Sequence, residues 1–305
     1  MSITPDAPSR AAIRRLPEDR LLAPWWLDEL CPAPQSAKPR DTLAHAVDGE
    51  WLRLRGAIPG ARSMDAKAVE AAVADLYATL FQRVEDLERP HLLRIWNGLP
   101  GISERMTTPD LDRWESAAPQ HEPFDRYMAF NAGRSAAFRK HFGEGSRLSR
   151  AIPAASAIGH RGDDLQVHVL AGGAPGEPLE NPRQVPAYQY SARYGPQPPV
   201  FARATRLGDR LFISGTASIV GEQSQHPGDL DEQFRETRAN LRAVVECHGV
   251  AEAALRRFRI YAPDPADLPT LQDRLQAAFP AAASIGVMRA DLCRPNLRVE
   301  IEAAT

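Results

Sequence analysis

The stretch FARATRLGDRLFISGTAS, residues 201–218, decides the fold that this sequence predicts. Its apolar side chains fall into two short β runs, 201–206 and 211–214. Between them, Gly208-Asp209 is typical of a hairpin turn. We therefore expect two antiparallel strands at the start of the C-terminal part of the chain.

The segments after this hairpin alternate between helical and strand patterns. Residues 230–247 carry an apolar stripe at helical spacing, and Gly249 is a suitable helix end. A strand over 256–261, a helix over 268–279 and two strands, 283–292 and 297–303, complete the series. The order β-β-α-β-α-β-β predicts a mixed sheet with two helices on one face, which is an α+β arrangement.

The N-terminal half repeats this helix-and-strand pattern weakly, which allows a degenerate second copy of the unit. Helices are expected over 65–84 and 124–142, and strands over 91–100 and 167–170. The sequence thus predicts an irregular arm (1–60) docked through Trp25 and Trp26, an N-terminal α+β domain (61–185) and a C-terminal domain (186–305).

Composition excludes several classes of function. The 305 residues have a formal charge of −2, from 37 basic and 39 acidic side chains without a long single-sign block, so nucleic acid is not an expected partner. No apolar stretch approaches the ~20 residues of a membrane span and no signal peptide is evident, so we expect a cytoplasmic protein without a membrane partner. Three separated cysteines and unpaired histidines predict neither disulfides nor a metal site, and no cofactor is expected.

The last strand carries the first indication of chemistry. Arg298, Glu300 and Glu302 alternate with apolar residues, so they share one face. A cleft that held Glu300 with the preceding Cys293 and Arg294 would bind an anion and deliver a proton to it. A solvated edge-strand face explains the same pattern. Glu300 and Glu302 share a face, so the sequence does not decide which of them is the acid.

Three motifs resemble known proteins. Residues 208–218, followed by the 230–247 helix and the VEIEA ending, resemble the RidA/YjgF superfamily of chorismate-mutase-like α+β domains. Residues 188–204, YQYSARYGPQPPVFARA, together with 126–134, RYMAFNAGR, resemble the chorismatase family over about residues 90–305. The resemblance implies two RidA/YjgF-like mixed-sheet halves with helices on one face of each sheet. It also implies cleavage of chorismate into pyruvate and a dihydroxycyclohexadiene carboxylate or a hydroxybenzoate.

The residue types in these motifs suit such a substrate. Chorismate has two carboxylates, and guanidinium groups match carboxylate geometry, so Arg134 and Arg203 are candidate ligands. Tyr127 lies on nearly the same helical face as Arg134, although helix packing also explains it. Further candidates are Tyr188, Tyr190 and Tyr194 for the ring-binding wall, with Tyr194 favoured. Gly215, Thr216 and Ala217 are candidates for close backbone approach to an anion.

The expected chemistry is protonation of the enolpyruvyl methylene by Glu300, whose pKa burial and the neighbouring Glu302 would raise. By resemblance, Cys293 favours hydroxybenzoate formation, while Ala217 departs from the glycine expected of pure 3-hydroxybenzoate formers. A mixture of 3- and 4-hydroxybenzoate is therefore predicted. A chorismate hydrolase is the alternative, and a RidA-type imine deaminase or ligand-binding module is the second alternative. Either a monomer or a homotrimer is compatible with the sequence.

Overall fold

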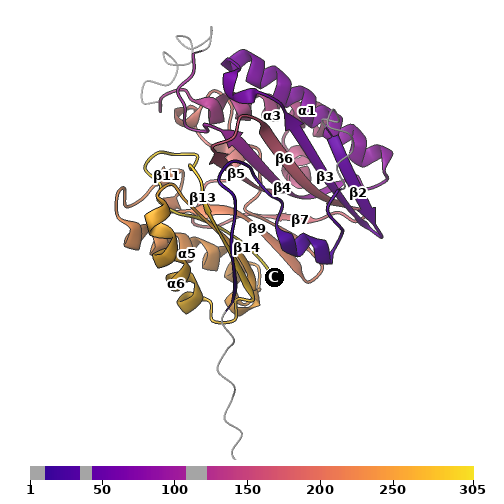
Figure 1. Ribbon diagram of the computed structural model, residues 1–305. Coiled ribbons are helices and arrows are strands. Elements are labelled where there is room, and N and C mark those ends of the chain that lie inside the picture. The colour runs from indigo at the N-terminus through magenta and orange to yellow at the C-terminus, as the bar shows by residue number, and fades with distance from the viewer. Residues whose placement is uncertain (1–10, 35–42, 108–121) are drawn as a thin grey trace, which may run out of the picture.

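Two mixed β-sheets pack face to face, and a pair of helices covers the outer face of each (Figure 1). The computed structural model describes residues 11–34, 43–107 and 122–305. One hydrophobic core lies between each sheet and its helices, and a third lies between the two sheets. This layering explains why strands such as β4 are apolar on both faces.

The first sheet belongs to the N-terminal half and has the strand order β2-β3-β6-β4-β5. Helices α1 and α3 cover it, and their apolar stripes contain Val73, Tyr77 and Phe138. Asp65 caps α1 by accepting a hydrogen bond from Ala68 N at 2.8 Å, as its position before the helix predicted. The elements are β2 (Leu43–Asp48), β3 (Trp51–Ile58), α1 (Ala66–Asp86), β4 (His91–Pro100), α3 (Arg126–Phe142), α4 (Ser146–Ala151), β5 (Ala154–His160) and β6 (Leu165–Gly172).

The second sheet belongs to the C-terminal half and has the order β1-β13-β12-β14-β9-β8-β7. Its central elements are β8 (Ala204–Leu207), β9 (Arg210–Ala217), α5 (Leu230–Cys247), β12 (Arg257–Ala262), α6 (Leu268–Ala278), β13 (Ser284–Arg289) and β14 (Glu300–Ala304). Two strands extend its edges, β1 (Ala12–Arg15) and β7 (Glu177–Leu179), and a short hairpin pairs β10 (Ile219–Val220) with β11 (Gln223–Ser224). The predicted order β-β-α-β-α-β-β is confirmed.

The two halves have the same topology. Reading from β2 or from β8, each half runs β-β-α-β-α-β-β, and the third and fourth strands of each pair in parallel, β4 with β5 and β12 with β13. All other neighbours among these ten strands are antiparallel. The α+β fold with two similar halves, expected from the resemblance, is therefore present.

The N-terminal arm is the main correction to the sequence analysis. Residues 1–60 are not irregular throughout, because β1 pairs in parallel with β13 and the hairpin β2–β3 belongs to the first sheet. The first structural unit thus begins at residue 43 rather than 61. Docking through tryptophan is correct: the Trp26 ring stacks on Phe212 at 6.3 Å between centroids and meets Trp96 edge-on at 6.2 Å.

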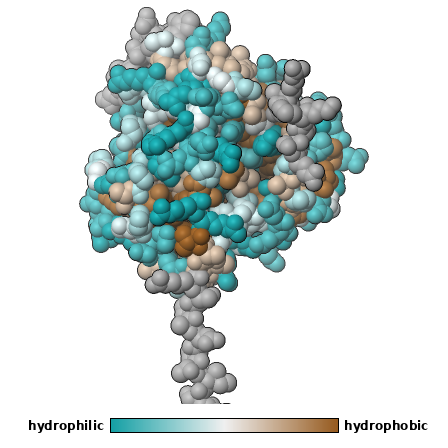
Figure 2. All heavy atoms as spheres, in the orientation of Figure 1, coloured by the Kyte–Doolittle hydropathy of each residue, from teal (hydrophilic) through white to brown (hydrophobic). Residues whose placement is uncertain are grey.

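Hydrophilic side chains cover most of the face shown in Figure 2, and hydrophobic ones form small separate groups on it. Within the described ranges, no helix combines the length and apolar character needed to cross a membrane.

Candidate active site

A cavity of about 570 Å³ lies between the two halves, and both contribute to its walls. The first half supplies β4, β5 and the start of α3, and the second supplies β9, β14 and the loop that holds Cys293 and Arg294. The segment between β7 and β8 closes one side with tyrosine, arginine and phenylalanine side chains. This volume lies in the range of small-molecule sites.

Glu300 lines this cavity from the first position of β14, where its backbone pairs with Ala217 of β9. Its side chain is buried, and no described residue forms a hydrogen bond or ion pair with it. Burial first, and the charge of Glu302 second, raise its pKa to about 8, while Arg94 opposes the shift. Glu300 therefore carries a proton at neutral pH.

The carboxyl group of Glu300 lies directly against the backbone of Gly215. A methyl group at position 215 would come within 2.7 Å of the Glu300 carboxyl carbon and 3.1 Å of Ser156 Oγ. A larger residue at position 215 would thus displace the Glu300 carboxyl group, although the backbone of residue 215 itself is ordinary strand.

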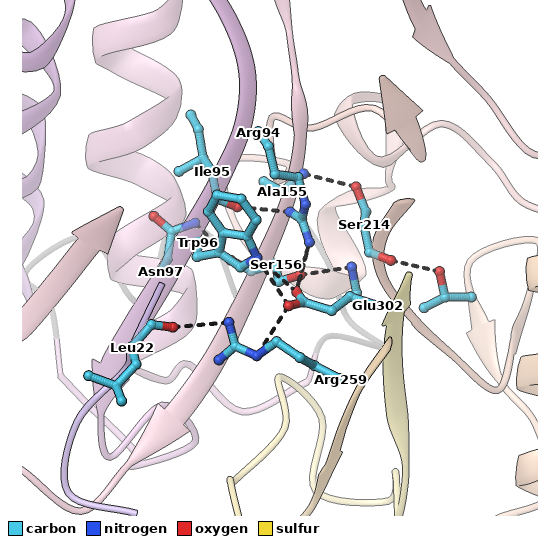
Figure 3. Close-up of polar contacts among 12 residues, drawn as sticks. Leu22, Arg94, Ile95, Trp96, Asn97, Ala155, Ser156, Ser214, Arg259 and Glu302 are labelled. Carbon is cyan, nitrogen blue, oxygen red and sulfur yellow. Dashed lines mark hydrogen bonds and ion pairs between the residues drawn. The ribbon is translucent and has the colours of Figure 1, made fainter. Parts of the chain in front are cut away.

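Glu302 occupies a different environment, a buried charge cluster behind the cavity wall (Figure 3). Its carboxylate accepts hydrogen bonds from Arg94 Nη2 at 2.8 Å, Ser156 Oγ at 2.7 Å and Trp96 Nε1 at 3.1 Å. Arg259 Nε approaches it at 3.4 Å. Two guanidinium groups and two further donors thus surround this carboxylate and hold it in place.

The two glutamates thus share a face, as predicted, but have opposite surroundings. Glu302 is saturated by donors, whereas Glu300 faces the cavity without one. Such a split is typical of carboxyl pairs in which one member is ionised and the other stays protonated.

Ser156 joins this cluster to the cavity wall. Its Oγ donates to Glu302 and accepts from Arg94 Nη2 at 2.5 Å and from Gly215 N at 2.9 Å. The hydroxyl therefore ties β5 of the first half to β9 and β14 of the second, at the point where Glu300 packs on Gly215.

Arg134 reaches the cavity from α3 and is buried. Its guanidinium lies over the rings of Tyr77 and Phe138, at 5.4 and 5.0 Å from their centroids. Among the described residues, its Nε and Nη2 have no hydrogen-bond partner. A buried guanidinium with two unused donors is suited to a carboxylate ligand.

Arg203 and Arg294 form a second cationic group, which packs on tyrosine rings. Arg203 Nη2 donates to Tyr190 Oη at 2.9 Å and to Val185 O at 2.8 Å. The Arg294 guanidinium lies 3.9 Å from the centre of the Tyr194 ring. These contacts fix both guanidinium groups at the cavity, where they favour a second anionic group.

Tyr127, Cys293 and Asp125 also line the cavity. Burial, followed by the charge of Glu300, raises the pKa of Cys293 to about 12, so the thiol stays protonated. Burial also raises the pKa of Tyr127, with the neighbouring Cys293 as the next cause. Both side chains are therefore neutral at physiological pH.

Two predicted site residues lie elsewhere. The side chain of Thr216 points to the opposite face of β9 from Gly215 and Ala217, because strand side chains alternate, and its Oγ1 donates to Ser214 O at 2.9 Å. Tyr188 packs against the first hydrophobic core, and Tyr190 takes the expected place in the cavity wall instead.

Sequence reasoning missed Asn97, Ser156 and Asp125, which also line the cavity. Asn97 accepts a hydrogen bond from Tyr77 Oη at 2.5 Å and donates to Ser156 O at 2.9 Å. Their segments carry no recognisable motif, but Asp125 stands immediately before the helix that bears Tyr127 and Arg134, which could have drawn attention to it.

Metal ligands do not gather at the cavity. In the part of the chain that the structure describes, no three His, Cys, Asp or Glu side chains are arranged to hold an ion. Guanidinium, phenol and hydroxyl groups supply the polar contacts instead, and this donor set suits an organic anion.

Known proteins resemble this chain over most of its length. A family model described as the N-terminal part of FkbO/Hyg5-like chorismatases matches residues 29–171. A 3-hydroxybenzoate synthase of Streptomyces hygroscopicus is 34% identical over 282 residues, which cover 86% of this chain and 76% of that protein. A chorismatase of Streptomyces rapamycinicus is 29% identical over 318 residues, which cover 99% of this chain and 87% of that protein. A chorismatase crystal structure matches with a TM-score of 0.73 at 29% identity, over 89% of this chain and 80% of that one.

Proposed function

The chain belongs to the chorismatase family, and from that premise we propose that it cleaves chorismate into pyruvate and hydroxybenzoate in the cavity between its halves. The observation that carries the proposal is the protonated, unpartnered Glu300 in a cavity bordered by buried arginines. An acid beside cationic anchors is what cleavage of an anionic enol ether requires.

Binding of the substrate rests on the two cationic groups. Arg134 offers two unused donors to one carboxylate, and Arg203 with Arg294 offers a positive field to the other. Because these guanidinium groups lie on aromatic rings, little of their conformational freedom is left to lose on binding. Tyr194 and Tyr190 supply the wall against which the ring of the substrate would pack.

The chemical step begins with proton transfer from Glu300 to the methylene carbon of the side chain. The carbon next to the ether oxygen becomes positively charged, and the bond between that oxygen and the ring breaks to release pyruvate. Glu302 is held charged by Arg94 and Arg259, so it takes no part in this transfer and keeps Glu300 protonated through its own charge.

The product depends on what the ring meets after pyruvate departs. Cys293 and Ala217 lie beside Glu300, and neither offers a charged group that would hold a water molecule there. Exclusion of water favours aromatisation, and we expect 3-hydroxybenzoate with some 4-hydroxybenzoate. A hydrolase would instead release the dihydroxycyclohexadiene carboxylate.

An imine deaminase is the less favoured function. The relatives that cover most of the chain are a 3-hydroxybenzoate synthase and a chorismatase. The cavity also needs side chains from both halves of the chain.

The test is incubation of the purified protein with chorismate, with an assay of pyruvate and chromatographic separation of the products against 3- and 4-hydroxybenzoate standards. We expect Glu300→Gln to lower the rate of pyruvate release by ~10²–10⁴-fold, because the amide cannot donate this proton. Glu144→Gln, at an exposed carboxylate on the far end of α3, is the matched control and should keep the wild-type rate.

A dihydroxycyclohexadiene carboxylate as the sole organic product would keep the family and replace the synthase by a hydrolase. Absence of pyruvate from the wild-type reaction would refute the proposed function.

A further inference from the structure

Formation of hydroxybenzoate requires a proton acceptor as well as a donor, provided that the proposed function holds. When the ether bond breaks, its electron pair goes to the oxygen that becomes the keto oxygen of pyruvate, and the ring is left one pair short. A ring C–H bond must then break, its electron pair completes the benzoate ring, and its proton leaves. One proton is consumed at the methylene and one is released from the ring, so no oxidant is needed.

Most titratable groups near the cavity cannot accept that proton. Glu302 is saturated by its donors and lies behind the wall (Figure 3). Cys293 and Tyr127 are neutral, and their raised pKa values show that they hold their own protons. Glu122 stands at the exposed margin, where it pairs with Arg193 at 3.3 Å.

Asp125 is the remaining carboxyl group of the described cavity lining besides Glu300. It precedes α3, and its Oδ1 accepts a hydrogen bond from Met128 N at 2.9 Å, which fixes the carboxyl group in place. Cys293 lies within electrostatic reach of both Asp125 and Glu300. Both carboxyl groups line the cavity, Asp125 from the first half of the chain and Glu300 from the second.

A role as helix cap alone does not account for this position. The carboxylate of a solvated N-cap usually has a low pKa, because backbone N–H groups stabilise its charge. Burial overrides those hydrogen bonds at Asp125 and raises its pKa to about 7. A group poised near neutral pH exchanges protons efficiently in both directions.

We propose that Asp125 is the general base that removes the ring proton during aromatisation, while Glu300 is the acid that releases pyruvate. The reaction itself calls for a separate acid and base, because the methylene carbon and the ring C–H bond are different parts of the substrate. It also follows from the architecture, which places a carboxyl group of each half on the same cavity. Glu300, once it has lost its proton, is the competing acceptor, and the experiment distinguishes the two.

The decisive variant is Asp125→Asn. Asparagine is as good a helix cap as aspartate and has the same shape, but its amide cannot accept a proton. We expect pyruvate release to continue while the hydroxybenzoate formed per pyruvate falls ~10-fold or more, with dihydroxycyclohexadiene carboxylate making up the difference. Asp65→Asn, at the corresponding cap of α1 and outside the described cavity lining, is the matched control and should keep the wild-type ratio.

Chemical rescue tests the same role without relying on loss of activity. Asp125→Ser keeps a cap and leaves room for a small carboxylate, so added formate should restore the hydroxybenzoate yield in this variant. The yield of Asp65→Ser should be at the wild-type level with or without formate. An unchanged ratio of hydroxybenzoate to pyruvate in Asp125→Asn would overturn the assignment, whether both products stay at wild-type rates or fall in parallel. Failure of the proposed function itself would differ, because wild-type protein would then release no pyruvate.

Discussion

Replacement of Gly215 by alanine tests the proposed acid through its packing. The added methyl group would lie 2.7 Å from the carboxyl carbon of Glu300, where carbon atoms normally stay about 3.5–4.0 Å apart. The Glu300 carboxyl must therefore move by roughly 1 Å. Because the obstructing atoms are the far end of a side chain, we expect the protein to fold with little loss of stability.

Catalysis should not tolerate the same movement. A misplacement of about 1 Å at a reacting group costs ~10²-fold in rate, which corresponds to ~2.7 kcal/mol of transition-state stabilisation. Initial rates of pyruvate release give kcat, and urea denaturation gives the free energy of unfolding. Gly173→Ala, where the nearest atom would be Arg89 Cδ at 3.8 Å, is the control.

Two results would contradict this reasoning. A Gly215→Ala enzyme with kcat within about threefold of wild type would show that the position of the Glu300 carboxyl does not limit the reaction. A large fall in the urea midpoint would show that the strand, rather than the carboxyl group, takes up the strain.

Three further outcomes are expected. Burial and the charge of Glu302 raise the pKa of Glu300 to about 8, and the protonated form is the active one, so kcat/KM should fall as pH rises through that value; a flat alkaline profile would exclude Glu300 as the acid. Glu302→Gln should lower the free energy of unfolding by ~3–5 kcal/mol, measured by urea denaturation, since it leaves two buried guanidinium groups without an anion. It should also move the alkaline limb of the pH–rate profile to lower pH, because the charge of Glu302 raises the pKa of Glu300. An unshifted limb would refute this electrostatic coupling between the two glutamates. Arg134→Lys should raise KM for chorismate by ~10-fold, because an ammonium group cannot make the two parallel hydrogen bonds of a guanidinium group to a carboxylate. Arg139→Lys, at an arginine of α3 that pairs with Glu144, should leave KM unchanged. Equal KM values for the two variants would rule out Arg134 as a carboxylate ligand.

Local patterns account for what sequence reasoning found of the fold. Helices α1, α3, α5 and α6 and strand β4 follow from apolar spacing and from caps such as Asp65, which depend only on neighbouring residues. The hairpin β2–β3 was missed although Leu52 and Leu54 alternate with Arg53 and Arg55, a pattern typical of a strand. Arg53 is nevertheless buried, since Asp28 and the carbonyl oxygen of Cys31 satisfy its guanidinium from a distant segment.

Residue types likewise predicted only some of the side chains that line the cavity. Four predicted residues do lie at the cavity: Tyr127, Arg134, Tyr194 and Arg203. They could be predicted because each belongs to a motif long enough to compare with known proteins. The choice between Tyr188 and Tyr190 depends on how a short turn orients two nearby side chains, and residue types alone do not determine that orientation.

The sequence by itself determined the order of helices and strands in the C-terminal half, the family and the pair of glutamates that share one face of the last strand. Only the tertiary structure separated the surroundings of the two glutamates, and those surroundings support Glu300 as the proposed acid. Arg94 and Trp96 lie more than two hundred residues before Glu302 in the chain, and together with Arg259 they fix its charge. Glu300 faces the cavity instead. Charge and pKa depend on burial and on partners in space, and those come together only when the two sheets pack against each other.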